Sequence, residues 1–267
     1  MPRLNWGADV KIVAFGDSLT DPAYYKTLDE IVRSAHDIEV VGHQHNGYKI
    51  SELMDYEFEK EVLATKPYAV VILAGTNDLG SIGIRFNNSE LQDYVNTNYP
   101  DYEPKTVEEL LEEQEKNRNQ PNFKYELYEQ ASLILRTEYL FEALREPIEQ
   151  IFERLKEFYE KAEAKGIQPV SVTIPSESSL YHFSVDRDVQ ALMYSTRPQI
   201  NKLIKDYSEQ NGMPCVDLHT ATTDPQTGLM RAELSKRDGL HFNNEGYQLM
   251  AGIVFEQGIV PLMERGM

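Results

Sequence analysis

Short apolar runs alternate with longer amphipathic stretches along most of this chain. The short runs are rich in β-branched residues and end at Gly, Pro or polar residues, as strands buried on both faces do. The longer stretches place apolar side chains at the i, i+3, i+4 spacing of helices that pack along one face. The expected strands cover residues 11–15, 38–41, 68–74, 168–174 and 215–218. The expected helices cover residues 24–34, 51–64, 148–165, 198–210 and 244–257.

Strands that alternate with helices predict an α/β fold with a mostly parallel sheet and helices on both faces. Right-handed crossovers place the carboxyl ends of the strands at one edge, where open α/β sheets bind ligands. We therefore expect polar residues that directly follow the strands to meet at this edge, although they lie far apart in the sequence. The chain of 267 residues can bury a full core, and we expect one domain over residues 1–267.

Residues 84–146 interrupt the alternation of strands and helices. They begin with a polar stretch; helical patterns follow from a capping-box start at Thr106 and again after Pro121. Pro147 is expected to break or kink the chain before the next helix. We expect a helical insertion after the third strand, at the ligand edge, which forms a lid that selects substrates or a surface for subunit contacts. Its many aromatic side chains suit sugars or acyl groups, although simple packing is their more common role.

Three polar segments lie where the predicted strands and the last predicted helix meet the ligand edge. Residues 16–20 follow the first strand, residues 75–78 follow the third strand, and residues 238–241 precede the last helix. Together they supply a hydroxyl, a carboxamide, an imidazole and a carboxylate. These are the chemical groups of a serine hydrolase.

Ser18 is the candidate nucleophile. A serine hydroxyl reacts only when a base takes its proton, and a sharp turn after the strand, which Gly16 permits, exposes the hydroxyl beside backbone N–H groups. Taken alone, a cap for the next helix, made by Asp17, Ser18 or Thr20, is the more common explanation of such residues.

Asp238 and His241 form the candidate acid–base pair, in a loop that Gly239 makes easier to turn. A carboxylate that holds the far nitrogen of the ring fixes its tautomer and stabilises the imidazolium. At the end of a central strand, the Asn77 amide can donate to a developing oxyanion; the alternative is an Asx turn. The backbone N–H of Gly47 is the expected second donor. Each signal is modest, but the groups follow the order and edge that a hydrolase needs.

These segments resemble sequence blocks of the SGNH hydrolase superfamily, also called the GDSL esterases and lipases. Gly-Asp-Ser-Leu at 16–19 is similar to the block that carries the nucleophile, Gly-Thr-Asn-Asp at 75–78 to the block with the oxyanion-hole asparagine, and Asp-Gly-Leu-His at 238–241 to the last block. The remaining block should supply a glycine. Gly47 fits it loosely, and Gly42 is a rival.

The resemblance covers about residues 10–84 and 147–260 and implies a three-layer α/β/α sandwich, flavodoxin-like, with a five-stranded parallel sheet in the order 2-1-3-4-5. It implies a serine esterase that works through an acyl-enzyme, with Ser18 as nucleophile, His241 as base and Asp238 as the orienting acid. Ser18 also belongs to the implied oxyanion hole through its backbone N–H.

The implied substrate class is broad. An esterase for carbohydrate O-acetyl groups or short acyl chains is the leading expectation, and a thioesterase or lysophospholipase is the alternative on the same fold. A non-catalytic binding module is disfavoured, because every reactive group is present. A flavodoxin-like phosphate binder is disfavoured too, because residues 16–18 do not form a P-loop and no dinucleotide fingerprint follows the first strand.

The charge and apolar content of the chain limit the partners and the location that we expect. The formal net charge of -18 disfavours nucleic acid and anionic membranes, so we expect a small-molecule ester as the partner, with oligomers formed through the insertion. Residues 1–9 lack a signal-like apolar stretch, and the longest apolar run, 68–74, is too short to span a bilayer. We therefore expect a cytoplasmic protein. The single cysteine, Cys215, rules out an internal disulfide and is expected to be buried filler.

His43 and His45 are the residues that could suggest a metal site. They lie two residues apart, with no further cluster of ligands near them in the sequence, and such a pair makes a poor site. The expectation is no metal and no cofactor. Asp78 is expected to brace the oxyanion loop rather than to react.

Overall fold

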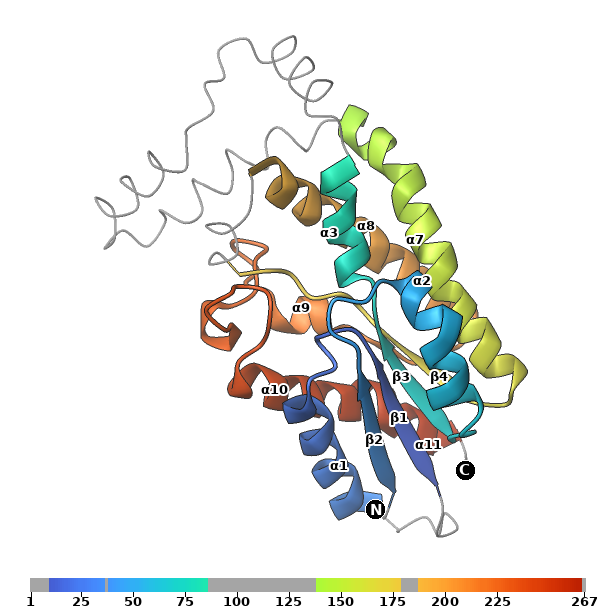
Figure 1. The fold of residues 1–267 in the computed structure, drawn as a ribbon. Helices are drawn as coiled ribbons and strands as arrows, with labels where there is room; N and C mark the ends of the chain where they lie inside the picture. The colour runs from blue at the N-terminus through green and yellow to red at the C-terminus, as the bar shows by residue number, and fades with distance from the viewer. Residues whose placement is uncertain (1–9, 37, 86–137, 179–186, 266–267) are drawn as a thin grey trace, which may run out of the picture.

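A computed structural model describes residues 10–36, 38–85, 138–178 and 187–265. Its centre is a five-stranded sheet in the order β2-β1-β3-β4-β5, and every pair of neighbouring strands is parallel (Figure 1). The predicted sheet and its strand order are confirmed. The strands are β1 (Lys11–Gly16), β2 (Glu39–Gln44), β3 (Ala69–Leu73), β4 (Gln168–Val172) and β5 (Cys215–Val216).

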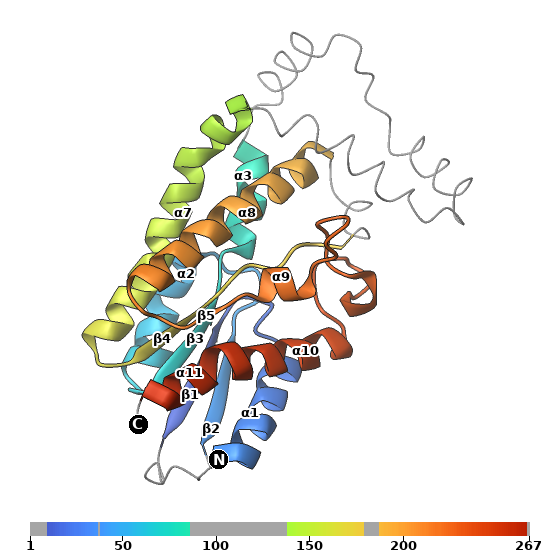
Figure 2. The same cartoon turned by 180° about the vertical axis from the view of Figure 1, so that it is seen from behind.

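Helices cover both faces of this sheet, as Figure 2 shows from behind. Side chains alternate across a strand, so β1 sends Ile12 and Ala14 into one core and Val13 and Phe15 into the other. The first core is closed by α1 (Pro22–His36), α10 (Asn244–Val254) and α11 (Val260–Arg265). The second is closed by α2 (Ile50–Glu52), α7 (Glu138–Ala164) and α8 (Arg187–Gln210). The result is the predicted three-layer α/β/α arrangement.

Two long helices run through proline residues. Of the break or kink predicted at Pro147, the break is wrong, because α7 continues across this residue. The second helix, α8, begins before Pro198 rather than at it. A proline inside a helix removes one backbone hydrogen bond at a cost of about 3 kcal/mol. Burial of apolar residues along the following turns, such as Ile148 and Ile151 in α7, offsets this cost.

The second strand is longer than its pattern indicated. We expected it to close at Gly42, but β2 continues to Gln44, and Gly42 pairs with Ala14 inside the sheet. A Cβ atom at position 42 would lie 2.0 Å from the Tyr25 ring of α1. This glycine therefore serves the close packing of a helix on the sheet and does not form a turn.

The expected helix over residues 51–64 forms as one continuous helical run that starts with α2. After α2 the chain winds into the wider turns of η1 (Leu53–Glu57) and η2 (Glu59–Leu63). The helix expected over residues 244–257 continues from α10 into η5 (Phe255–Ile259). The elements that were not expected are α3 (Thr76–Arg85), α9 (Leu218–Thr222), η4 (Ala232–Leu234) and α11. Of these, α3 matters most for function, because it begins three residues after β3 and carries Asn77.

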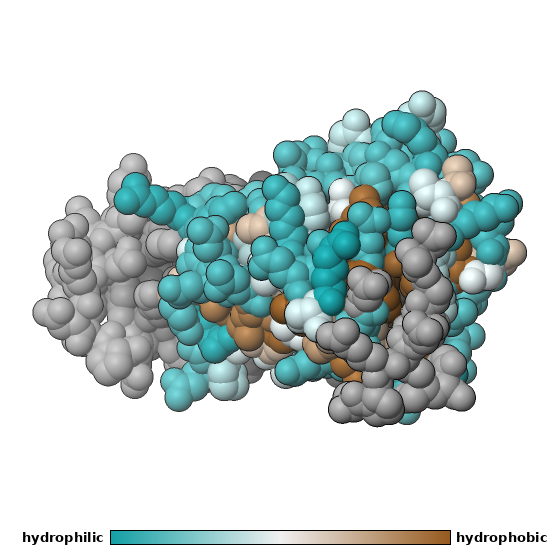
Figure 3. Space-filling view, turned by 90° about the horizontal axis from the view of Figure 1, so that it is seen from below, coloured by the Kyte–Doolittle hydropathy of each residue, from teal (hydrophilic) through white to brown (hydrophobic). Residues whose placement is uncertain are grey.

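Most of the predicted insertion, residues 86–137, lies outside the described residues, so its roles as lid or subunit surface stay predictions. Seen from below, the surface is mostly hydrophilic, and apolar residues show in patches between polar ones (Figure 3). Among the helices of the described ranges, each is too short or too polar to cross a bilayer.

Candidate active site

Ser18 lies in a tight turn at the carboxyl end of β1. The Asp17 N–H donates to the Leu73 carbonyl at 3.1 Å, which ties the turn to β3. A Cβ atom at Gly16 would lie 1.8 Å from the same Leu73 oxygen, so only glycine allows the two strands to approach here. The turn is therefore part of the sheet and moves with it.

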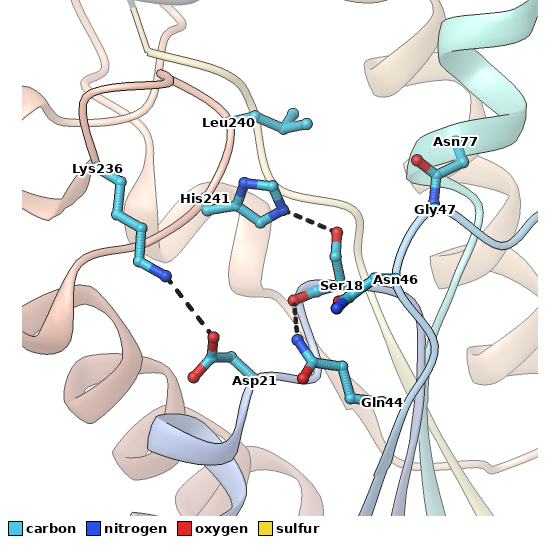
Figure 4. A pocket seen from close by; sticks show the side chains of 9 residues that line it. All are labelled: Ser18, Asp21, Gln44, Asn46, Gly47, Asn77, Lys236, Leu240 and His241. Atoms are coloured by element: carbon cyan, nitrogen blue, oxygen red, sulfur yellow. Dashed lines mark hydrogen bonds and ion pairs between the residues drawn. The ribbon is translucent and has the colours of Figure 1, made fainter.

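The helix after this turn is capped by Asp21. Its side chain accepts the Ala23 N–H at 2.8 Å, and Pro22 occupies the first helical position, where its missing N–H costs nothing. None of the three residues considered from the sequence as caps is therefore needed for this role. The Ser18 side chain points into a cavity instead (Figure 4).

The cavity brings together residues that lie 223 positions apart. His241 Nε2 lies 2.8 Å from Ser18 Oγ, as the dashed line in Figure 4 shows, and His241 Nδ1 lies 2.9 Å from Asp238 Oδ2. The hydroxyl, the imidazole and the carboxylate thus form one hydrogen-bonded chain, with both ring nitrogens engaged. This is the geometry in which a ring nitrogen can take the serine proton while a carboxylate supports the resulting charge.

The other carboxylate oxygen of Asp238 holds the backbone of its own loop through hydrogen bonds. Asp238 Oδ1 accepts the backbone N–H groups of Leu240 and His241, each at 2.9 Å. Partial burial would raise the pKa of Asp238, but these two donors and the His241 ring outweigh it, and they hold the pKa below its usual value. The carboxylate is therefore ionised at neutral pH, as a partner for an imidazolium must be.

The loop is anchored to the extension of β4. The Ser178 N–H donates to the Gly239 carbonyl at 2.7 Å, and the Lys236 N–H donates to the His241 carbonyl at 2.8 Å. The preceding residue, Glu177, forms an ion pair with Arg197 of α8, and both side chains are buried. A buried pair of this kind resists displacement, because separating it would leave a charge in a poorly solvated place.

On the opposite side of Ser18, residues 45–48 form a turn closed by the Tyr48 N–H on the His45 carbonyl at 3.3 Å. Gly47 adopts a φ of 78°, a left-handed conformation that favours glycine, and it lines the cavity. Asn77, in the first turn of α3, donates its side-chain N–H to the Tyr48 carbonyl at 2.9 Å and lines the same cavity. The structure thus brings Gly47 and Asn77 together beside Ser18, whereas the rival Gly42 lies within β2.

Ser18 and Gly47 both line this space. Within the described residues, neither the Ser18 N–H nor the Gly47 N–H donates to a backbone carbonyl. Unpaired N–H groups at the end of a parallel sheet are suited to an anionic oxygen.

The cavity has a volume of about 440 Å³ and is open to solvent. Five of the residues that line it are not among the site residues predicted from the sequence: Asp21, Gln44, Asn46, Lys236 and Leu240. Gln44 donates to the Ser18 carbonyl at 2.9 Å, and Lys236 Nζ lies 3.6 Å from Asp21 Oδ2 (Figure 4). Gln44 and Asn46 could have been found as polar neighbours of Gly47 at the end of a strand. Nothing in the sequence pattern marks Asp21 or Lys236.

Two buried carboxyl groups lie behind the cavity. Burial raises the pKa of Asp17 to about 6, although its Oδ1 accepts the Leu19 N–H at 3.0 Å. Burial also raises the pKa of Asp78, whose Oδ2 accepts the Ile50 N–H at 3.0 Å. This bond ties α3 to α2, in keeping with the bracing role expected for Asp78.

The structure is a three-layer α/β/α protein with a hydrogen-bonded serine, histidine and aspartate at the carboxyl edge of its sheet. Residues 14–249 match the GDSL-like Lipase/Acylhydrolase family, and the chain belongs to this family. It is accordingly a carboxylic ester hydrolase, which acts on small-molecule esters. No curated protein matches the chain in sequence.

Solved structures of similar fold carry related names. A GDSL-like lipase from Bacteroides thetaiotaomicron has a TM-score of 0.57 and 16% identity, covering 98% of this chain and 94% of its own. An acetyl xylan esterase named AlAXEase has a TM-score of 0.56 and 16% identity, with 92% and 98% covered. A variant of an acetyl xylan esterase from Geobacillus stearothermophilus has a TM-score of 0.54 and 16% identity, with 95% and 96% covered. At this identity the similarity establishes a shared fold.

Proposed function

We propose that the chain is a serine esterase that removes acetyl or other short acyl groups from polar alcohols, with Ser18 as its nucleophile. The observation that carries the proposal is the hydrogen-bonded chain from Ser18 Oγ through His241 to Asp238, with distances of 2.8 and 2.9 Å. Such a chain activates a serine hydroxyl, which is otherwise a weak nucleophile.

In the first half of the reaction, His241 Nε2 takes the Ser18 proton while Oγ attacks the ester carbonyl carbon. The carbonyl oxygen gains the negative charge of the tetrahedral intermediate. In this proposal the N–H groups of Ser18 and Gly47 and the Asn77 amide stabilise this charge. Removal of one such donor typically costs about 3–4 kcal/mol of transition-state stabilisation. The intermediate then collapses, the imidazolium gives its proton to the leaving alcohol, and the acyl group stays on Ser18.

In the second half, a water molecule attacks the acyl-enzyme and His241 takes one of its protons. The new tetrahedral intermediate expels Ser18 Oγ, which regains a proton from the ring, and the carboxylic acid leaves. Asp238 stays ionised throughout, because its two backbone donors remain in place, and it stabilises the imidazolium at each step.

The lining of the cavity supports a short acyl group and a polar leaving alcohol. Of the described lining residues, only Leu240 carries a large apolar side chain, whereas Asp21, Gln44, Asn46 and Lys236 present hydrogen-bonding groups. Hydroxyl-rich alcohols such as sugars find partners for their hydroxyl groups there, while a long acyl chain would meet mostly polar atoms. Two similarly folded proteins named as acetyl xylan esterases support the same choice. A thioesterase or lysophospholipase is the less favoured alternative.

The test replaces Ser18 with alanine, which leaves the backbone of the turn in place. Ser18→Ala is expected to unfold at the same temperature as the parent chain and to lose about 10⁶-fold in kcat, because nucleophile and base act as a unit. A fluorophosphonate probe should label the parent chain on Ser18 and leave the variant unlabelled. Ester hydrolysis by a pure Ser18→Ala protein at more than a hundredth of the parent rate would overturn the assignment.

A substrate panel tests the second part of the proposal. Acetylated xylo-oligosaccharides and short-chain p-nitrophenyl esters should be hydrolysed with higher kcat/KM than long-chain esters or acyl-thioesters, because the described lining offers few apolar contacts. A preference for long acyl chains would point to the lysophospholipase alternative while leaving the role of Ser18 intact.

A further inference from the structure

A second group of chemically active side chains lies near the oxyanion side of the cavity without lining it. It consists of His43, His45, Glu57 and Glu61, and we refer to it as the histidine–glutamate cluster. The sequence predicts no metal site at the two histidines, because no further ligands follow them closely along the chain. The fold brings two glutamates to them from a different element.

The geometry of the two elements explains the meeting. His43 is the next-to-last residue of β2, and His45 directly follows Gln44 at the end of this strand. The two histidines lie two residues apart, so they project to the same side of the extended chain. Glu57 and Glu61 lie four residues apart on the helical turns of η1 and η2, a spacing that places them on neighbouring turns.

The distances within the histidine–glutamate cluster are close to those of a coordination sphere. His45 Nε2 lies 2.8 Å from Glu61 Oε2, and His43 Nδ1 lies 3.4 Å from the same oxygen. Ligand atoms of His45, Glu57 and Glu61 all lie within 4.8 Å of one another. Ligands about 2.1 Å from a tetrahedral ion are about 3.4 Å apart, so small side-chain movements would complete the sphere.

The electrostatics of the cluster favour a cation. Two carboxylates approach each other here, and the side chains of His45 and Glu61 are only 14% and 15% exposed. Lys60 approaches Glu57 at 4.0 Å, but its side chain is 59% exposed and forms only a weak surface pair. A divalent ion held between the carboxylates would neutralise their mutual repulsion far more effectively.

We propose that the histidine–glutamate cluster binds a divalent transition metal ion, with Zn²⁺ as its occupant. Two imidazole nitrogens and two carboxylate oxygens form a donor set that zinc accepts in tetrahedral geometry. Calcium and magnesium prefer all-oxygen sites, so the two histidines select against them. The site is distinct from the Ser18–His241 chain and requires no part of it.

The position of His45 gives the proposed site a consequence. The His45 N–H donates to the Gly16 carbonyl at 3.0 Å, and its own carbonyl closes the turn that contains Gly47. Its ring packs between those of Phe15 and Tyr48, with centroid distances of 5.6 and 5.4 Å. A metal ion bound to His45 would therefore immobilise the turn beside Ser18, and its role would be structural.

The test titrates the full chain, stripped with EDTA, with ZnCl₂ in a calorimeter. One zinc ion per chain is expected, together with a rise in unfolding temperature, since a ligand that binds only the folded state stabilises it. His45→Gln and Glu61→Gln should each weaken zinc binding at least tenfold. The control, His36→Gln, removes a histidine of α1 that lies outside the cluster and should bind zinc as the parent does.

Two further measurements separate this proposal from its rivals. Co²⁺ in place of zinc should give the absorption spectrum of a tetrahedral nitrogen–oxygen site. If Glu61→Gln does not fold, Glu57→Gln, which removes the other carboxylate, should alter this cobalt spectrum. His241→Gln should leave zinc binding unchanged. Absence of binding, binding that survives loss of His45 and Glu61, or binding abolished in His241→Gln would each overturn the proposal, and none of these results bears on Ser18 as nucleophile.

Discussion

The turn that carries Ser18 and the loop that carries His241 each hold an aspartate, and they treat it in opposite ways. Asp17 is fully buried and accepts the Leu19 N–H, and burial raises its pKa to about 6. Asp238 is half exposed, and two backbone donors and the ring hold its pKa below the usual value. Both carboxyl groups have hydrogen-bond donors, so the depth of burial, rather than residue type, decides the direction in which each pKa shifts.

The two regions also differ in how their backbones are fixed. The Ser18 turn is joined directly to the sheet, because the Asp17 N–H donates to the Leu73 carbonyl of β3. The loop of Asp238 and His241 is held at its surface by individual hydrogen bonds, such as that from Ser178 to the Gly239 carbonyl. We therefore expect substitutions in the loop to affect activity more than stability. A substitution of the buried Asp17 should affect stability more than activity.

Among the substitutions that test this comparison, Asp238→Asn has the largest expected effect. The amide oxygen can still accept the two backbone N–H groups, but the ring loses the negative partner that stabilises its charged form, and kcat should fall about 10³- to 10⁴-fold. Stability should change by less than about 1 kcal/mol, because half of the side chain is exposed to solvent. Steady-state hydrolysis of p-nitrophenyl acetate and urea unfolding measure the two quantities. Activity within tenfold of the parent would show that the loop carboxylate is not needed.

The matched substitution, Asp17→Asn, should act on stability and its dependence on pH. The pKa of Asp17 rises from 3.8 in the unfolded reference to about 6 in the folded chain, so the folded state holds a proton that the unfolded state releases between these values. The contribution of Asp17 to the free energy of unfolding therefore falls by about 3 kcal/mol as pH rises from about 4 to 6. Above and below this range the contribution is constant.

Asn cannot ionise, so the variant should lack this contribution while it still accepts the Leu19 N–H. Urea unfolding of both proteins at several pH values between 4 and 8 measures the difference between the two curves. Parallel curves across the whole range would mean that Asp17 ionises as readily folded as unfolded, and the contrast with Asp238 would disappear.

The smallest expected effect concerns Lys236, the side chain that joins the two regions. Its Nζ lies 3.6 Å from Asp21 Oδ2, and the side chain is 44% exposed, so Lys236→Met should cost less than about 1 kcal/mol of stability. Because Lys236 lines the cavity, KM for an acetylated sugar should rise several-fold with little change in kcat. The exposed Lys202→Met serves as the control, since Lys202 lies on α8 outside the described lining. A fall in kcat with constant KM would instead give Lys236 a role in holding the loop.

Periodicity predicted the five strands and their order of appearance, and the polar segments predicted the reactive groups, because both signals are local. Gly42 and Pro147 show where local signals fail. Glycine marks a turn in most sequences, yet Gly42 makes room for Tyr25, and proline ends most helices, yet α7 continues through Pro147. In both cases packing against another element outweighs the preference of the residue itself.

By itself the sequence determined the class of fold and singled out Ser18, His241 and Asp238 as candidate site residues, because strand patterns and the order of chemical groups are written along the chain. Only the tertiary structure decided what surrounds them. Lys236 reaches Asp21, and Glu61 reaches His45, across helix, strand and loop boundaries. Such contacts depend on how elements pack in three dimensions, and the spacing of residues within one segment does not encode the distance between two segments.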